Sequence, residues 1–150
     1  MQNLPEQWNQ ATHFFDLPDF LTFKATNSLS RSSCSLVSKW TYSAHDGWDK
    51  DFWTKIGLDE IVNNNFYNIG PVVLPPGDPV GEGLTSKAAA EMVLQPHTPV
   101  GASLIDAHCG GIGTIGVNVS DTKLPCVNKP LTERIAIICG TSSCHMAVSF

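Results

Sequence analysis

The chain has 150 residues, a formal net charge of −5 and only 9 Lys and Arg residues, which are scattered along the sequence. Nucleic-acid binding needs clustered positive charge to meet phosphates, so that partner is not expected. No apolar run approaches the roughly 20 residues that cross a bilayer, and the N-terminus lacks a signal-peptide pattern, so we expect no membrane association and a cytoplasmic protein.

Charged residues make up 15% of the chain, compared with roughly 25% in typical soluble domains. Low charge suggests that part of the surface faces other protein; a surface rich in Ser, Thr and Asn is the alternative. The 5 cysteines are an odd number at irregular spacing, so a disulfide framework is not expected. Cys139 lies in the apolar run 135–139, which predicts a buried thiol.

Helices are expected through the first 95 residues. Asp16 and Pro18 are typical of a helix start and predict a helix over residues 18–26. Apolar spacing predicts a second helix over 28–42 and a third over 49–64, broken at Gly57.

The next segment is rich in proline and glycine from residue 71 to 83, which predicts a loop. Thr85 is expected to cap a helix over 86–93. Residues 100–105 are expected to form a short apolar strand that ends at Asp106.

The end of the chain predicts a β-hairpin, with strands over 135–139 and 144–149 after a loop over 118–130. A two-stranded hairpin is marginally stable alone. We therefore expect a sheet that would continue with further strands.

Asp106 is the first candidate for chemistry. A carboxylate at a strand end, followed by the small residues of 107–111, could approach a substrate hydroxyl and accept its proton. A helix N-terminal aspartate that satisfies backbone donors is the alternative.

The second candidate is the sequence Gly140-Thr141-Ser142-Ser143, which follows the predicted strand over 135–139. Backbone N–H groups and hydroxyls in such a turn can hold phosphate oxygens. An ordinary hairpin turn built from turn-forming residues is the alternative.

Three further patterns are weaker signals. Residues 111–116 fit the dinucleotide pattern G-x-G-x-x-G, but five residues separate them from the predicted strand, whereas the pattern needs the turn immediately after it. Cys139, Cys144 and His145 could bind zinc but lack two compact ligand pairs. Lys39 could contact a polar ligand or extend into water.

Four segments carry a resemblance to the FGGY carbohydrate kinases, and within them to the ribulokinase-like branch. They are FFDLPDFLTFKA (14–25), CSLVSKWTY (34–42), LIDAHCGGIG (104–113) and ICGTSSCHM (138–146). The resemblance implies an α/β protein with an incomplete actin-like ATPase (ribonuclease H-like) fold. The C-terminal part of the first family domain would comprise residues 1–117, and the start of the second domain would comprise residues 133–150. Residues 118–132 would form the linker between the two domains.

The resemblance also implies roles for single residues. Asp106 would be the catalytic base, Lys39 would bind the sugar together with Asp106, and Gly140, Thr141 and Ser142 would hold the phosphates of ATP. Mg²⁺ is implied as cofactor, with most ligands outside this chain. The Asp-x-Gly-Thr hairpin that opens the family, other early substrate residues and the adenosine site have no counterpart here, and Val93 and His97 stand where glycine is more usual.

From this resemblance we expect a piece of an ATP-dependent kinase for a ketopentose such as ribulose, inactive alone. Two alternatives stay open. One is a non-catalytic module that associates with a full-length kinase, favoured by the low charge and the incomplete sheet. The other is a dinucleotide-dependent oxidoreductase, which rests only on residues 111–116.

Overall fold

A computed structural model describes residues 4–120, 123–125 and 127–149 as a mixed α/β chain. The chain divides into two compact units, residues 1–104 and 105–150, which are treated separately below. Within the described ranges, no helix is both long and apolar enough to cross a membrane.

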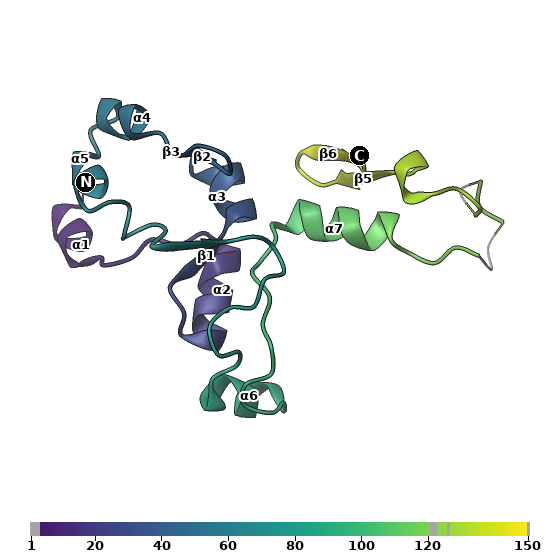
Figure 1. The fold of residues 1–150 in the computed structure, drawn as a ribbon, viewed down its shortest axis with the longest axis horizontal. Helices are drawn as coiled ribbons and strands as arrows, with labels where there is room; N and C mark the ends of the chain where they lie inside the picture. The colour runs from purple at the N-terminus through teal and green to yellow at the C-terminus, as the bar shows by residue number, and fades with distance from the viewer. Residues whose placement is uncertain (1–3, 121–122, 126, 150) are drawn as a thin grey trace. The chain divides into compact units, whose positions relative to one another are not determined.

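The first unit consists of short helices joined by two small pairs of strands (Figure 1). β1 (Ser30–Ser32) pairs in parallel with β4 (Val72–Leu74), and β2 (Tyr42–Ser43) pairs antiparallel with β3 (Gly47–Trp48). The helices are α1 (Pro5–Gln10), α2 (Leu17–Thr26), α3 (Ser33–Lys39), α4 (Lys50–Lys55), α5 (Asp59–Asn63) and α6 (Ser86–Met92).

Two apolar clusters hold this unit together. The larger is aromatic: Trp53, Ile61, Phe66 and Ile69 are buried, and the Trp48 ring stacks on Phe66 at 4.9 Å between centroids. The smaller joins α2 to α6 through three alanines and a leucine, Ala25, Ala88, Ala89 and Leu84. Small side chains allow the two helices to approach closely.

Local sequence signals identified several of these helices. α2 begins after Asp16 with Pro18 in its first turn, although the Asp16 side chain makes no capping hydrogen bond. α4 and α5 are separated at Gly57, which has a φ of +78°. The Thr85 hydroxyl accepts the Ala88 N–H at 3.2 Å and caps α6, which confirms the predicted helix start.

The single helix predicted over 28–42 is wrong. Residues 30–32 form β1, and α3 begins only at Ser33, where the Ser32 hydroxyl accepts the Cys34 N–H at 3.1 Å. The cause is tertiary: β1 pairs with a strand about forty residues away, and Arg31 and Ser32 are each 1% exposed. Pairing over that distance leaves no local periodicity.

The predicted strand over 100–105 is also absent. Gly101 forms an isolated bridge with Pro79, and the Ala102 N–H donates to Asp78 O at 2.7 Å. The segment is therefore extended but pairs with an irregular loop rather than with a strand. Any side chain at Gly101 would press on the Gly77 backbone, 3.2 Å from where its Cβ would lie.

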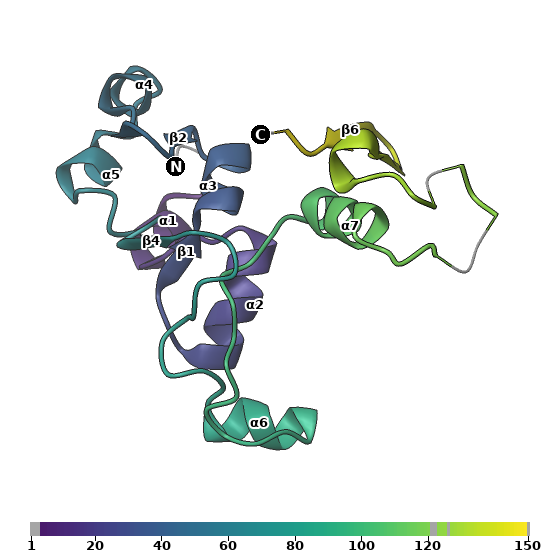
Figure 2. The same cartoon turned by 45° about the vertical axis from the view of Figure 1, so that its right-hand side comes forward.

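In the part of the second unit that the structure describes, an α-helix is followed by a hairpin, seen from two directions in Figures 1 and 2. α7 (Asp106–Ile115) is followed by a 3₁₀ turn, η1 (Leu131–Glu133), and by the antiparallel strands β5 (Ile135–Cys139) and β6 (Ser143–Ala147). The hairpin confirms the prediction, with β6 ending earlier than expected. Cys139 is exposed, so its predicted burial is wrong: it lies on the hairpin face that turns away from α7.

The end of α6 gives a stability prediction. Val93 has a left-handed backbone, φ 58° and ψ 41°, and the Leu94 N–H donates back to Ala89 O at 2.8 Å. Such a helix end favours glycine, and a β-branched residue there is strained by roughly 1–2 kcal/mol. The Val93 side chain is 90% exposed, so its removal breaks few packing contacts.

We therefore expect Val93→Gly to raise the free energy of unfolding by about 1 kcal/mol, measured by urea denaturation. Val93→Ala is the matched control, because it removes the branch but keeps the Cβ, and it should gain less. A Val93→Gly protein no more stable than the original would show that the left-handed residue carries no strain.

Candidate functional site

Asp106 is the first residue of α7 and is exposed. Its Oδ1 accepts the N–H of Ala107 at 2.8 Å. A carboxylate at this end of a helix is favoured by the unpaired N–H groups and the helix dipole. Asp106 thus occupies the helix N-terminus that was the alternative to a strand end, and its carboxylate remains open to solvent and to a ligand.

The hairpin packs along α7 in the opposite chain direction. Near the middle of the helix, a Cβ on Gly110 would lie 3.3 Å from Ile138 Cγ1, and one on Gly111 would overlap Met146 Sδ. Near its C-terminal end, Arg134 Nη1 donates to Ile115 O at 3.1 Å. From Arg134, just before β5, to Ile138 within it, the contacts therefore move toward the start of α7.

Extending this register places the turn Gly140–Ser142 beside the first turn of α7. Four helical residues back from Gly110 to Asp106 cover about 6 Å, and two strand residues forward from Ile138 to Gly140 cover about 7 Å. Figure 1 shows the hairpin turn and the start of α7 at the same end of this unit. From this register we expect two of the predicted site segments, Asp106 and residues 140–142, to lie near each other.

The turn itself has exposed polar groups. Residues 140–143 are all exposed, and the Gly140 N–H donates to Ser142 O at 2.8 Å, so this amide closes the turn. Among the residues that the structure describes, the hydroxyls of Thr141 and Ser142 make no hydrogen bond. These two residues, rather than Gly140, have groups available to an anion.

Lys39 belongs to the first unit, where it is the last residue of α3 and is exposed. A cation at the C-terminal end of a helix interacts favourably with the helix dipole. The structure therefore gives Lys39 an ordinary structural explanation, and a role in binding sugar stays a prediction.

The structure opposes the dinucleotide alternative. Residues 111–115 lie inside α7 and Gly116 is its C-terminal cap, whereas a dinucleotide fingerprint needs its glycines in the turn before a helix. Of these glycines, Gly111 instead allows the hairpin to approach α7 closely, since a Cβ there would overlap Met146.

The described residues do not fit a metal site. They include no group of three or more His, Cys, Asp or Glu side chains able to hold an ion. For the zinc alternative, the hairpin register pairs Cys139 with Ser143 and Ile138 with Cys144. Successive strand residues point to opposite faces, so Cys144 points away from both Cys139 and His145.

The glycines of α7 allow a matched pair of substitutions. We expect Gly113→Ala to raise the free energy of unfolding of this unit by about 0.8 kcal/mol, because alanine favours helix and nothing lies within 4 Å of its Cβ. Gly111→Ala should lose that gain or destabilise, since the methyl group displaces Met146.

Thermal and urea unfolding of the two variants would measure the difference. Equal stabilisation by both substitutions would mean that the hairpin does not pack against α7 through Gly111, and it would remove the register on which the site depends.

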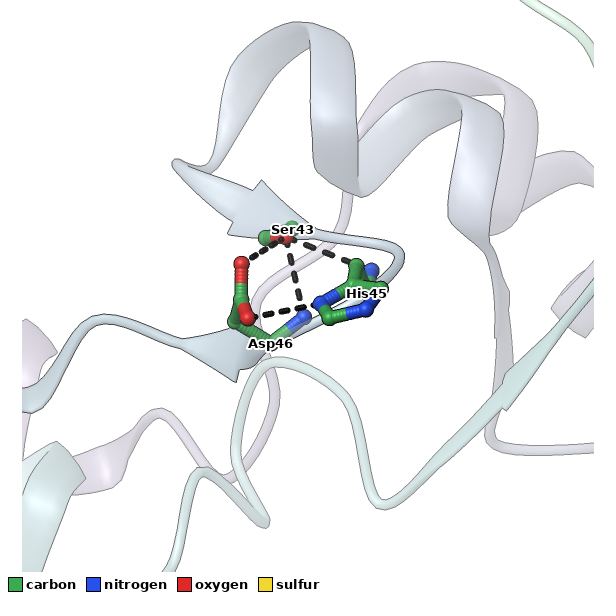
Figure 3. Close-up of polar contacts among 3 residues, drawn as sticks. All are labelled: Ser43, His45 and Asp46. Atoms are coloured by element: carbon green, nitrogen blue, oxygen red, sulfur yellow. Dashed lines mark hydrogen bonds and ion pairs between the residues drawn. The ribbon is translucent and has the colours of Figure 1, made fainter.

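A Ser–His–Asp cluster in the first unit was missed by the sequence analysis (Figure 3). His45 Nδ1 lies 2.8 Å from Asp46 Oδ1, and the Ser43 hydroxyl donates to Asp46 Oδ2 at 3.0 Å while accepting the Asp46 N–H. The bonds from His45 and then Ser43 lower the pKa of Asp46. The only sequence signal is the spacing of turn-forming residues between Ser43 and Gly47.

This arrangement stabilises the turn between β2 and β3 and does not activate a nucleophile. A catalytic serine must give its proton to the histidine, whereas the Ser43 proton points to the carboxylate. The side chains of His45 and Asp46 are 94% and 78% exposed, so solvent screens their attraction.

Comparison with known proteins gives strong similarity over nearly the whole chain, although no family model matches it. The chain is 60% identical over 149 residues to the FGGY carbohydrate kinase domain-containing protein of Danio rerio, covering 99% of this chain and 27% of that protein. The Homo sapiens protein of the same name is 57% identical over 142 residues, covering 95% and 26%.

A more distant relative is the D-ribulokinase of Saccharomyces cerevisiae, 34% identical over 165 residues, which covers 93% of this chain and 22% of that protein. The chain thus spans about a quarter of the length of the curated relatives it matches.

Proposed function

We propose, from the membership of this chain in the FGGY carbohydrate kinase family, that Asp106 is the general base of an ATP-dependent sugar phosphorylation. One observation carries the proposal: the exposed carboxylate of Asp106 and the exposed turn Gly140–Ser142 lie at the same end of the second unit.

The reaction follows from these two groups. A carboxylate oxygen of Asp106 accepts the proton of a sugar hydroxyl. At the same time the hydroxyl oxygen attacks the γ-phosphorus of ATP, and the bond between this phosphorus and ADP breaks. Thr141 and Ser142 contact phosphate oxygens through their hydroxyls and N–H groups, and Gly140 holds the turn closed. Because the described residues offer no metal site, we assign no step to Mg²⁺ within this chain.

The substrate we propose is a ketopentose such as ribulose, which rests on the name of the yeast relative. Lys39 would contact the sugar. The fold would be part of an actin-like ATPase. The C-terminal part of its first domain would be residues 1–117, the linker residues 118–132 and the start of its second domain residues 133–150. Since the chain matches only about a quarter of its relatives, we expect it to be inactive alone.

A chimera tests the proposal. This chain replaces the matched segment of the Danio rerio relative, and ATP-dependent ADP release is measured with D-ribulose. We expect turnover comparable with the unaltered host and none from the 150-residue chain alone. A folded chimera that is inactive where the host is active would contradict the proposed role, and turnover by the isolated chain would contradict its proposed inactivity.

Association with a longer kinase is a second candidate. Three isoleucines of the second unit are highly exposed, Ile112 at 62%, Ile135 at 61% and Ile137 at 54%. Ile135 and Ile137 lie on the same face of β5, and exposed apolar side chains side by side suit contact with protein. Size-exclusion chromatography with the Danio rerio relative would test this: co-elution is expected, and a clean monomer that elutes separately would end this candidate.

A further inference from the structure

The first unit buries a carboxylate that the proposed chemistry does not use. Asp19 lies in α2 and is 1% exposed. Its Oδ1 accepts two hydrogen bonds, from the Ser32 N–H at 2.9 Å and from the Ser103 hydroxyl at 2.9 Å. One oxygen atom therefore joins α2, the start of α3 and a segment 84 residues further along the chain.

The surroundings of this carboxylate do not favour its charged form overall. Burial raises the pKa of Asp19, so desolvation outweighs the hydrogen bonds and the nearby positive charge of Arg31. Arg31 itself is held elsewhere, by Leu29 O at 2.6 Å and by Phe14 O at 3.1 Å. Buried charges of this kind often contribute less to stability than apolar packing would, and they serve to fix one arrangement.

The segment that Asp19 holds leads directly to the proposed base. Ser103 precedes Asp106 by three residues, and residues 100–105 form no strand that would hold them by a regular ladder. The Ser103 hydroxyl is thus a side-chain anchor just before the start of α7.

We propose that Asp19 is a positioning residue that, through Ser103, fixes the segment entering Asp106. The relevance to catalysis rests on the proposed function of Asp106, but the anchoring itself does not. Asp19 touches no reacting group in this proposal. Its effect is to limit the backbone freedom of residues 104–107, which start α7.

The test is amide hydrogen exchange of the full chain, measured residue by residue by NMR. Ser103→Ala removes the hydroxyl that donates to Asp19 and keeps the Asp19 carboxylate. It therefore avoids the risk of unfolding that Asp19→Ala carries. We expect exchange at Cys109, whose N–H donates to Ile105 O at 3.0 Å and closes the first turn of α7, to speed up by about tenfold, the effect of losing a hydrogen bond to a charged group. Ser103→Thr keeps the hydroxyl and should restore slow exchange.

Thr98→Ala is the matched control, because its hydroxyl bonds only locally, to Gln95 O at 2.7 Å. It should leave exchange at Cys109 unchanged. Unchanged exchange in Ser103→Ala, or an increase spread evenly over the first unit, would overturn the inference. Loss of the proposed base role would instead appear as full turnover in Asp106→Asn, so the two failures are distinguishable.

Discussion

Asp106→Asn in the kinase chimera should lower kcat by about 10²–10⁴-fold with a smaller change in KM. Asparagine keeps the shape of the side chain but cannot take up the hydroxyl proton, and loss of a general base has an effect of this size. The Asn Oδ1 can still accept the Ala107 N–H, so α7 should keep its start. Steady-state ADP release against sugar concentration separates the two constants.

Asp59→Asn is the matched control for this substitution. Asp59, like Asp106, is the first residue of a helix and its preceding residue makes no side-chain cap. The same chemical change should leave kcat within about twofold, since helix-end charges contribute only about 0.3–1 kcal/mol. If both variants keep full activity, Asp106 is not the base.

The largest stability effect is expected at Arg31. We expect Arg31→Met to lower the free energy of unfolding by about 3 kcal/mol, because it removes a buried guanidinium and leaves the partly buried carbonyls of Leu29 and Phe14 without these donors. It also removes the guanidinium from the Phe15 ring, whose centroid lies 3.6 Å away. Arg31→Lys should recover little of this, since an ammonium group lacks the planar fork.

Urea denaturation followed by tryptophan fluorescence measures the loss, because the first unit contains the aromatic cluster around Trp53. Lys87→Met is the control: the Lys87 side chain is 84% exposed and should be worth less than about 0.5 kcal/mol. An Arg31→Met protein as stable as the Lys87→Met protein would mean that Arg31 is not buried as described.

The parts of the fold that were predicted depend on neighbours in sequence. Thr85 caps α6, Gly57 separates α4 from α5, and the residues 140–142 close a hairpin. Each of these signals acts over a few residues and does not depend on long-range contacts. β1 was missed because its partner, β4, lies far along the chain.

For the site, the sequence predicted Asp106 at an element boundary with a strand end and a helix start as alternatives, and the structure has the helix start. Apolar residues before it suggested a strand, whereas those residues bond to an irregular proline-rich loop. The proximity of Asp106 to the turn could not be read locally either. It depends on the close packing that Gly110 and Gly111 allow between α7 and the hairpin.

A nuclear Overhauser spectrum of the isotopically labelled chain would most directly test whether Asp106 lies near the turn Gly140–Ser142. The proposed transfer of a phosphoryl group requires the proton acceptor and the phosphate-holding turn to be neighbours. Cross-peaks should link protons of Asp106 and Ala107 with those of Gly140, Thr141 or Ser142. Cross-peaks from that turn to the far end of α7 instead, near Ile115, would reverse the hairpin on the helix and contradict the kinase site.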